Sequence, residues 1–280
     1  MTCIVVATDL SSRSTIAIGR ARMLAAETGA ELVVVHVVDD DLPAAIIERR
    51  RLEAAEILDA RNPGDDGADG PAVRVVVEVG EVFSAVSEVA EEAGAALIVA
   101  GDHRRSRWRD LFQDTTVERL IRAANRPVLI ARTPARSAYA EPLLAVESDE
   151  AAELLGALET VAARPARLIA VHAHGAPAAG LMFHAGISRD AIAEHQRTDS
   201  ARIRSRLAKA FGSVDCRIDI RVIDEVPLAA IRSVADAEGC DLIVVSSHAR
   251  RAPLRGLLGS VSSALIREGF RDVMIVPRRD

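Results

Sequence analysis

A basic loop near the end of the chain contains the residue types that bind a phosphate group. It follows a short apolar run, residues 242–245, and leads into a stretch with apolar residues at helical spacing. Its arginines and glycines are Arg250, Arg251, Arg255, Gly256 and Gly259. Backbone N–H groups and the positive end of a helix dipole favour an anion in such a loop. We therefore predict a phosphate site in this loop (residues 246–261, called the second loop below). A solvated basic turn is the alternative interpretation.

The same pattern occurs earlier in the chain. Residues 97–132 align with residues 242–277 without a gap, so that His103 corresponds to His248 and Arg105 to Arg250. The first loop (residues 101–116) is therefore the counterpart of the second. A duplication of this length predicts two copies of one fold in tandem.

The first loop leads into a helix that begins with acidic residues. Asp114 can cap this helix, and Thr115 with Glu118 has the spacing of a capping box. In both arrangements a carboxylate occupies the position of an anion, and Arg104 stands where a residue without a side chain would fit better. We expect the first loop to be filled by its own carboxylate.

The second loop leads into a helix that begins with Gly259-Ser260, with no acid beside them in the sequence. Ser246 and Ala249 are small residues at the start of this loop. Because no carboxylate competes for the anion position, we expect the second loop to bind a phosphate group better than the first.

The histidines do not form a recognisable catalytic motif. His103 and His248 occupy equivalent loop positions, but no carboxylate, serine or cysteine stands at a recognisable spacing from either. The sequence also lacks the nucleophile elbow G-x-S-x-G and the nucleotide-binding motif G-x-x-x-x-G-K-[ST]. His36 and His172 lie in apolar runs and are expected to be packed core residues. We therefore predict no catalytic and no metal-binding residues.

Unbroken apolar runs alternate with helical segments in both halves of the chain. The runs are residues 3–7, 32–38, 73–79, 96–100 and 128–131, then 143–146, 168–171, 217–223, 242–245 and 273–276. This alternation is typical of parallel sheets that are buried on both faces. We predict an α/β fold with two tandem doubly wound domains, residues 1–133 and 142–280, joined by a linker at 134–141. The second domain carries an insertion at 175–186.

Composition excludes several classes of protein. The net charge of −6 argues against a general nucleic-acid binder, and no apolar run approaches the length of a membrane-spanning helix. No secretory signal opens the sequence. Cys3, Cys216 and Cys240 are widely spaced and odd in number, which favours reduced thiols and a cytoplasmic location.

Ligands of open parallel sheets bind at the carboxyl ends of the strands. Residues at these ends are Asp9, Val37, Gly80 and Gly101 in the first half, and Glu147, Ala173, Glu225 and Ser246 in the second. A carboxylate after the first strand of each half can accept hydrogen bonds from a ribose or a base amino group. A helix amino-terminal acid, favoured by the helix dipole, is the alternative interpretation.

These residues resemble the universal stress protein family in its tandem form, once in each half. The resemblance lies in Ala7-Thr8-Asp9-Leu10-Ser11, in Val35-His36-Val37, in Gly80 and in the final strand, loop, helix and strand. Nucleotide-binding members carry G-x2-G-x9-G-[ST] in that last region. The corresponding residues here are Ser246, Ala249, Gly259 and Ser260 in the second half, and Gly101, Arg104, Asp114 and Thr115 in the first. The spacing is kept in both halves, and most of the glycines are replaced.

The resemblance implies a five-stranded parallel sheet with helices on both faces in each half. It also implies that binding members hold ATP or AMP, and ATP would bring Mg²⁺ with it. In the second half the implied nucleotide contacts are Glu147, Ala173, Ser246, His248, Ala249, Arg250, Gly259, Ser260 and Val261. In the first half they are Asp9, Val37, Gly101, Arg104, Thr115 and Thr116. Glu147 is longer than the aspartate usual in the family, and Glu225 replaces the turn glycine and crowds the ribose side.

The resemblance further implies that the edges at residues 128–131 and 273–276 pair within one chain, and that whole chains form a homodimer. Our first hypothesis is a stress-response protein that binds an adenine nucleotide weakly, chiefly in its second half, without fast turnover. The second is a nucleotide-free dimeric interaction protein whose pockets have degenerated. Slow ATP hydrolysis is a third reading. The first two hypotheses are distinguished by the motif glycines in each loop. Retained glycines favour nucleotide binding, and replaced glycines favour the nucleotide-free protein.

Overall fold

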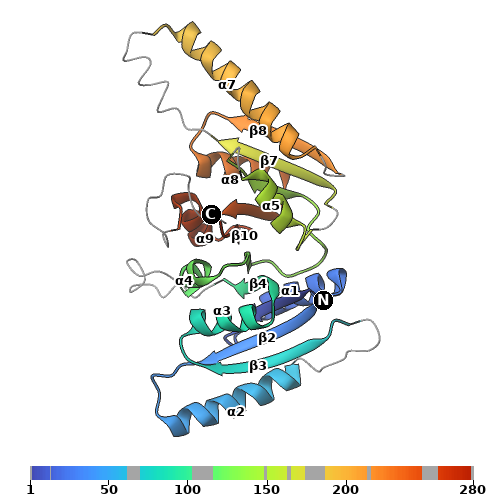
Figure 1. Cartoon of the computed structure of the whole chain (residues 1–280), viewed down its shortest axis with the longest axis vertical. Coiled ribbons are helices and arrows are strands. Elements are labelled where there is room, and N and C mark those ends of the chain that lie inside the picture. Colours follow the sequence, from blue (N-terminus) through green and yellow to red (C-terminus); the bar gives the residue numbers. More distant parts are fainter. Residues whose placement is uncertain are drawn as a thin grey trace. The chain divides into compact units, whose positions relative to one another are not determined.

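The structure is a computed structural model that describes residues 2–12, 14–61, 70–102, 116–147, 150–162, 165–173, 187–212, 216–247 and 258–278 (Figure 1). It divides into two compact units. Unit 1 contains Met1–Ala138 and Ser247–Asp280, and unit 2 contains Tyr139–Ser246. The expected insertion at 175–186 lies outside the described residues.

Unit 1 is built on a mostly parallel sheet, and its first five strands match the apolar runs of the first half. Its strands are β1 (Cys3–Ala7), β2 (Glu31–Val38), β3 (Val73–Val79), β4 (Ala95–Gly101), β5 (Val128–Ala131) and β10 (Asp272–Val276). The order is β3-β2-β1-β4-β5-β10. The first five strands are parallel, and β10 is antiparallel to β5.

The strand order of unit 1 explains the position of its helices. These are α1 (Ser14–Thr28), α2 (Ala44–Arg61), α3 (Val82–Glu92), α4 (Thr116–Ala123) and α9 (Ser260–Glu268). The chain moves one way along the sheet from β1 to β3 and returns past β1 to reach β4 and β5. Since parallel crossovers are right-handed, α1 and α2 cover one face while α3 and α4 cover the other.

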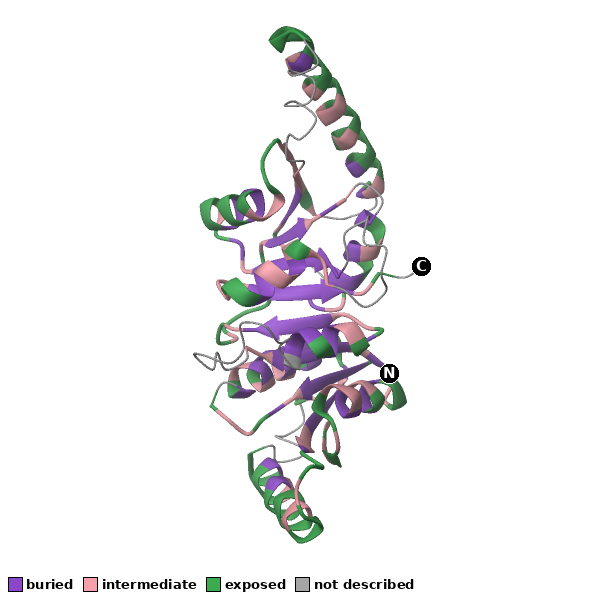
Figure 2. Cartoon of the chain, turned by 90° about the vertical axis from the view of Figure 1, so that its left-hand side faces the viewer, coloured by how far each residue is buried: buried purple, intermediate pink, exposed green. Residues whose placement is uncertain are grey.

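The core of unit 1 lies where strands are covered on both faces. Residues such as Val5, Val33 and Leu97 are fully buried in the central strands (Figure 2). Burying one such side chain stabilises the fold by roughly 1.5–3 kcal/mol, which is why the unbroken apolar runs form the centre of the sheet. Gly29 and Gly94 have positive φ and stop the helices before β2 and β4.

Unit 2 repeats the parallel plan. Its strands are β6 (Pro142–Ala145), β7 (Arg167–Ala173), β8 (Arg217–Ile223) and β9 (Leu242–Ser246), all parallel, in the order β9-β6-β7-β8. Its helices are α5 (Ala151–Leu158), α7 (Arg189–Ala210) and α8 (Pro227–Glu238). The predicted α/β class with mostly parallel strands is confirmed. The expected strands in both halves agree with the observed ones to within two residues at each end.

The compact units differ from the sequence repeats in one segment. Residues 247–280 end the second repeat, yet they pack with the first. Strand β10 pairs with β5 through Val273 with Ile130 and Met274 with Leu129. These are the two edges, residues 128–131 and 273–276, whose pairing the family resemblance implies. The repeat boundaries themselves stay a prediction, because a repeat in sequence and a compact unit in space need not coincide.

A buried arginine fastens the C-terminal segment within unit 1. Arg132 directly follows β5, and its guanidinium donates to the carbonyl oxygens of Arg271 at 2.9 Å and Ile266 at 2.6 Å. Its Nε lies 3.5 Å from a carboxylate oxygen of Asp102. Polar groups that are removed from water need such partners, so this side chain helps to place α9 and β10.

The three cysteines are free, and Cys3 and Cys240 are buried. The expectation of unpaired thiols is therefore confirmed. Among the described residues, no helix combines the length and the apolar character that crossing a membrane requires.

Candidate functional site

The candidate residues of the first half lie at one edge of the sheet of unit 1. Asp9 follows β1, Val37 lies near the end of β2, and Gly101 is the last residue of β4. Because β2, β1 and β4 are parallel neighbours, their carboxyl ends share this edge. Thr116 begins α4. Arg104 and Thr115 lie outside the described residues.

The turn after β1 holds Asp9 in a defined conformation. Leu10 has φ of 63°, the only positive value among the non-glycine residues that the structure describes. The Thr8 hydroxyl accepts from the Leu10 nitrogen at 3.1 Å and donates to Ser14 Oγ at 2.8 Å. Asp9 Oδ1 accepts from the Ser11 nitrogen at 3.0 Å. The turn therefore presents an ordered carboxylate at the ligand edge.

The pKa of Asp9 lies below its ordinary value. Partial burial works in the opposite direction and would raise it, but hydrogen bonds from Ser11 and Ser14 outweigh this effect. Asp9 itself is exposed. The carboxylate therefore stays ionised at neutral pH and acts as a hydrogen-bond acceptor, which is the role needed to bind a ribose hydroxyl or an adenine amino group.

A buried acid lies in the first turn of α4. Glu118 is 1% exposed, and its Oε1 accepts from Nε and Nη2 of Arg267, both at 3.3 Å. A carboxylate at this place complements the helix dipole and disfavours a second anion. The expected caps Asp114 and Thr115 lie outside the described residues, so the self-filled first loop remains a hypothesis that Glu118 supports.

Three candidate residues of the second half lie at the carboxyl edge of unit 2. Glu147 follows β6, Ala173 ends β7, and Ser246 ends β9. The strands are parallel neighbours in the order β9-β6-β7, so these residues share an edge as the sequence predicted. His248, Ala249 and Arg250 lie outside the described residues.

A buried glutamate that was not predicted from the sequence contacts Ser246. Glu150 is 4% exposed, and its Oε2 accepts a hydrogen bond from Ser246 Oγ at 3.0 Å. It directly precedes α5. Nothing in the local sequence distinguishes Glu150 from a solvated acid at a helix start, because its partner is far away in the chain. A carboxylate therefore stands at the end of β9, where none was expected.

The amino end of α9, in unit 1, carries the remaining candidates. Gly259 is the N-cap and has no side chain to cap the helix, and the first turn contains no acid. The Gly259 nitrogen donates to the Ser247 oxygen at 2.8 Å, while Ser262 Oγ donates to the oxygens of Gly259 and Ser247 at 3.0 and 3.2 Å. Ser260 is exposed and Val261 half-buried. This helix end is well ordered and lacks a negative charge.

The turns after the third strands differ between the halves. Gly80 has φ of 146°, and its nitrogen donates to the Val38 oxygen at 3.0 Å. Glu225 is the counterpart of Gly80 in the second half. It does not have a positive φ, since Leu10 is the only described non-glycine residue that does. The replacement of the glycine thus changes the backbone path as well as adding a side chain.

One group of acidic side chains in the described residues is close enough to share a cation. Asp39, Asp40 and Asp41 follow β2 and are all exposed. The Asp41 nitrogen donates to Asp39 Oδ1 at 3.0 Å, which is the geometry of an ordinary turn. An exposed acidic turn is common in proteins without a metal, so we assign none to it.

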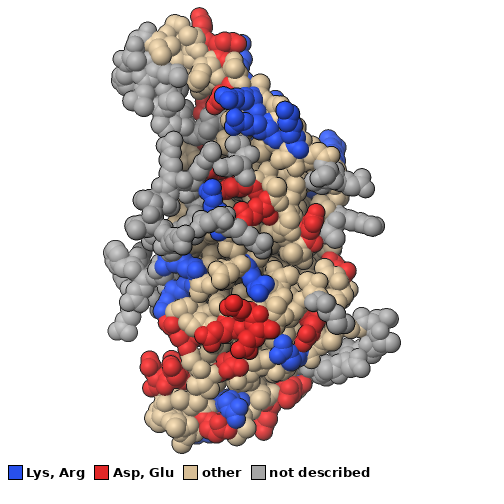
Figure 3. Space-filling model, in the orientation of Figure 1, with Lys and Arg blue, Asp and Glu red and all other residues tan. Residues whose placement is uncertain are grey.

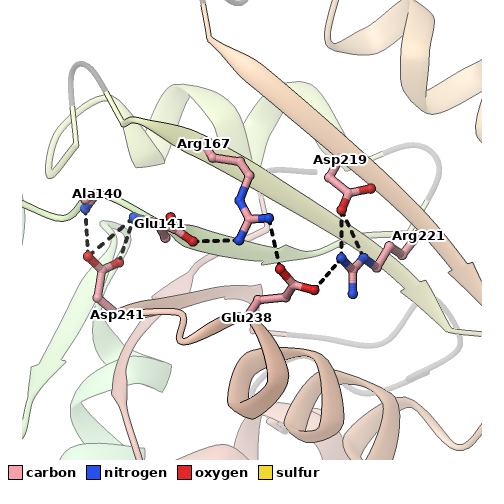
Figure 4. Close-up of polar contacts among 7 residues, drawn as sticks. All are labelled: Ala140, Glu141, Arg167, Asp219, Arg221, Glu238 and Asp241. Carbon is pink, nitrogen blue, oxygen red and sulfur yellow. Dashed lines mark hydrogen bonds and ion pairs between the residues drawn. The ribbon is translucent and has the colours of Figure 1, made fainter.

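Unit 2 has a chain of ion pairs at the opposite end of its strands, where β6, β7 and β9 begin (Figure 4). Glu238 pairs with Arg167 at 2.9 Å and with Arg221 at 2.6 Å, and Arg167 also pairs with Glu141 at 2.6 Å. The pKa of Glu238 is lowered by its hydrogen bonds with Arg221 and Arg167. These contacts join β7, β8 and α8 on the side away from the ligand edge, so we interpret them as structural.

The comparisons with known proteins agree with this architecture. The model of the universal stress protein family matches residues 1–132 and 142–277. A universal stress protein from Archaeoglobus fulgidus DSM 4304 has a TM-score of 0.74 and 17% identity, covering 99% of this chain and 97% of that one. A functionally unknown protein from Pseudomonas aeruginosa PAO1 has a TM-score of 0.67 and 16% identity, covering 99% and 92%. At these identities the likeness shows the fold alone.

No curated protein matches the chain. The family model, however, matches twice, once in each half, and together the two matches cover most of the sequence. This protein is therefore a member of the universal stress protein family in its tandem form.

Proposed function

We propose that this protein binds an adenine nucleotide, ATP or AMP, chiefly through its second half and without fast turnover. The observation that carries the proposal is the amino end of α9, which has neither an acid in its first turn nor a capping side chain. A phosphate group there would meet the N–H groups of the first turn and the positive end of the helix dipole, worth about 0.3–2 kcal/mol. Mg²⁺ would accompany ATP.

The first half is proposed to contribute little binding. Its equivalent helix, α4, already carries the buried carboxylate of Glu118 in its first turn. A phosphate would have to approach that charge, whereas α9 presents no such obstacle. Gly259, Ser260 and Val261 are therefore the proposed phosphate contacts. The adenosine contacts Glu147, Ala173 and Ser246 rest on the resemblance.

Fast turnover is not part of the proposal, because the hydrolase and nucleotide-binding motifs named above are absent from the sequence. The protein would hold its nucleotide as a signal or a stabilising ligand. A ligand that binds only the folded state raises the free energy of unfolding in proportion to the logarithm of its concentration. Nucleotide binding would in this way link the stability of the protein to the nucleotide level.

A nucleotide-free interaction protein is the second candidate, and Glu150 favours it. Its buried carboxylate lies against Ser246, so a like charge stands at the strand end where the resemblance places the ligand. The described surface also offers charged faces for a partner. The carboxyl half of α7 exposes Arg202, Arg206 and Lys209, and Figure 3 shows basic side chains gathered over α7. If this second candidate is correct, the dimeric protein binds another protein instead of a nucleotide.

Calorimetric titration of ATP with Mg²⁺, and of AMP, into the protein separates the two candidates. The test variant is Gly259→Asp, with Gly259→Asn as the neutral control of nearly the same size. Aspartate is a good N-cap, so Gly259→Asp should keep or raise the melting temperature while abolishing binding. Gly259→Asn should retain most of the affinity. Absence of heat and of any thermal shift at millimolar ATP would leave the nucleotide-free protein as the better account.

A further inference from the structure

A histidine in the second strand of each half makes the same hydrogen bond. His36 Nδ1 in β2 lies 2.9 Å from the Thr8 oxygen, and His172 Nδ1 in β7 lies 2.8 Å from the Val146 oxygen. Both imidazoles are half-buried. A carbonyl oxygen only accepts, so Nδ1 carries the proton in both rings. From their apolar strands these histidines were expected to be packed core residues, but each makes a polar contact to the main chain.

The residue that accepts this hydrogen bond stands directly before the candidate acid in each half. Thr8 precedes Asp9, and Val146 precedes Glu147. The accepting oxygen belongs to the peptide unit that also contains the nitrogen of the acid. Since a peptide unit is planar and rigid, holding its oxygen fixes the orientation in which the chain enters the acidic residue.

The same residues are also held through their nitrogens. The Thr8 nitrogen donates to the Val35 oxygen, and the Val146 nitrogen donates to the Val171 oxygen, both at 2.9 Å. These bonds continue the ladder between the first two strands of each half by one residue. With the histidine on the following oxygen, the chain is therefore fastened on both sides of the residue that precedes the acid.

We infer that His36 and His172 are positioning residues that orient the peptide units of Asp9 and Glu147. That this orientation serves ligand binding rests on the proposed function. The two contacts lie in different compact units, yet in both the imidazole comes from the second strand of its half and holds the residue directly before the acid. An apolar residue of similar size could fill the space of either ring but could not hold the carbonyl oxygen.

The conformation of the Asp9 turn provides a readout that needs no nucleotide. The hydrogen bonds that hold the pKa of Asp9 below its ordinary value come from Ser11 and Ser14 in the same turn. If His36 fixes the entry to this turn, its loss should weaken these bonds. Asparagine is the conservative replacement, because its amide nitrogen can donate from nearly the place of Nδ1.

The experiment compares His36→Leu and His36→Asn by carboxyl NMR titration of Asp9 and by hydrogen exchange of its amide. Leucine should move the pKa of Asp9 up towards its ordinary value and speed the exchange, while asparagine should leave both close to the parent protein. An unchanged pKa and exchange rate in a folded His36→Leu variant would overturn the inference. A melting curve of each variant separates a local effect from general destabilisation.

The same pair of substitutions at His172 tests the link to binding in the second half. His172→Leu should weaken ATP affinity by about tenfold, the worth of one hydrogen bond, and His172→Asn should restore most of it. If the parent protein binds no nucleotide, the proposed function fails while the Asp9 measurements still decide whether the histidines position the acids. If the parent binds and His172→Leu binds equally well, the role in binding is wrong.

Discussion

Asp272 Oδ1 accepts hydrogen bonds from the backbone nitrogen of Arg132 at 2.8 Å and from that of Thr133 at 3.0 Å. Its other oxygen, Oδ2, lies 3.6 Å from Nε of Arg20, and both side chains are almost completely buried. The first residue of β10 thereby caps the end of β5. This contact explains why the last segment of the second repeat packs with the first.

We predict that Asp272→Asn destabilises unit 1 strongly. The amide keeps the shape of the carboxylate but leaves the buried Arg20 guanidinium without its counter-charge. Breaking a buried ion pair in this way costs about 3–5 kcal/mol. Chemical unfolding of the variant and the parent protein measures the loss.

Asp241→Asn is the matched control for Asp272. Asp241 also precedes a strand and accepts from backbone nitrogens, that of Ala140 at 2.7 Å among them, but it is only half-buried. The Asp241→Asn substitution should lower the free energy of unfolding by about 1 kcal/mol. Equal losses from the two substitutions would show that the buried arginine adds nothing.

Part of the depression of the Asp9 pKa should be lost in Ser11→Ala, because the Ser11 side chain is among the groups that lower it, while the hydrogen bond from the Ser11 nitrogen remains. In the parent protein the folded pKa is depressed. Asp9 therefore stabilises the fold above the unfolded pKa, and this contribution is lost as the pH falls through the folded value. Carboxyl NMR titration measures the shift. Ser12→Ala, at the exposed neighbouring residue, serves as the control and should leave the pKa of Asp9 unchanged.

Glu150→Gln should raise the affinity for ATP by about tenfold, since removing a nearby like charge is worth about 1–2 kcal/mol at the effective dielectric constant of a protein site. Glutamine can still accept the hydrogen bond from Ser246, so the fold should be retained. Glu159→Gln makes the same charge change at the far end of α5 and should have little effect. Equal affinities in all three proteins would remove Glu150 from the account of nucleotide binding.

Cys240 should be the least reactive of the thiols at pH 8. Burial, followed by the charges of Asp241 and Glu141, raises the pKa of the Cys240 thiol to about 11. Alkylation requires the thiolate, so labelling should be much slower than at the half-buried Cys216. Mass spectrometry of timed samples, with Cys216→Ser as a check on assignment, measures both rates.

The raised pKa of Cys240 also predicts a loss of stability in alkaline solution. The folded protein keeps this thiol protonated, whereas the unfolded chain releases the proton near the ordinary value of 9.0. The contribution is therefore fully present below pH 9 and is lost as the pH rises towards the folded value. Cys240→Ser should show a smaller decline in unfolding free energy over this range. An identical decline in both proteins would contradict the prediction.

Local sequence was sufficient for the strands, the parallel arrangement and the duplication. An unbroken run such as residues 3–7 has one stable place in an α/β fold, the interior of a sheet covered on both faces. Glycines such as Gly29 mark helix ends through their own backbone freedom, and this too is local. The candidate acids Asp9 and Glu147 followed from the same logic, because ligands bind where parallel strands end.

Only the tertiary structure decided which polar groups meet. Glu150 looks like any acid at a helix start until β9 brings Ser246 against it, and His36 looks like a core residue until β2 places it beside Thr8. Asp272 likewise gains its role from a strand far away in the chain. Hydrogen bonds and ion pairs are short-ranged and directional, so their partners depend on the register of distant segments. Apolar burial is non-directional, and its pattern can be read from the sequence alone.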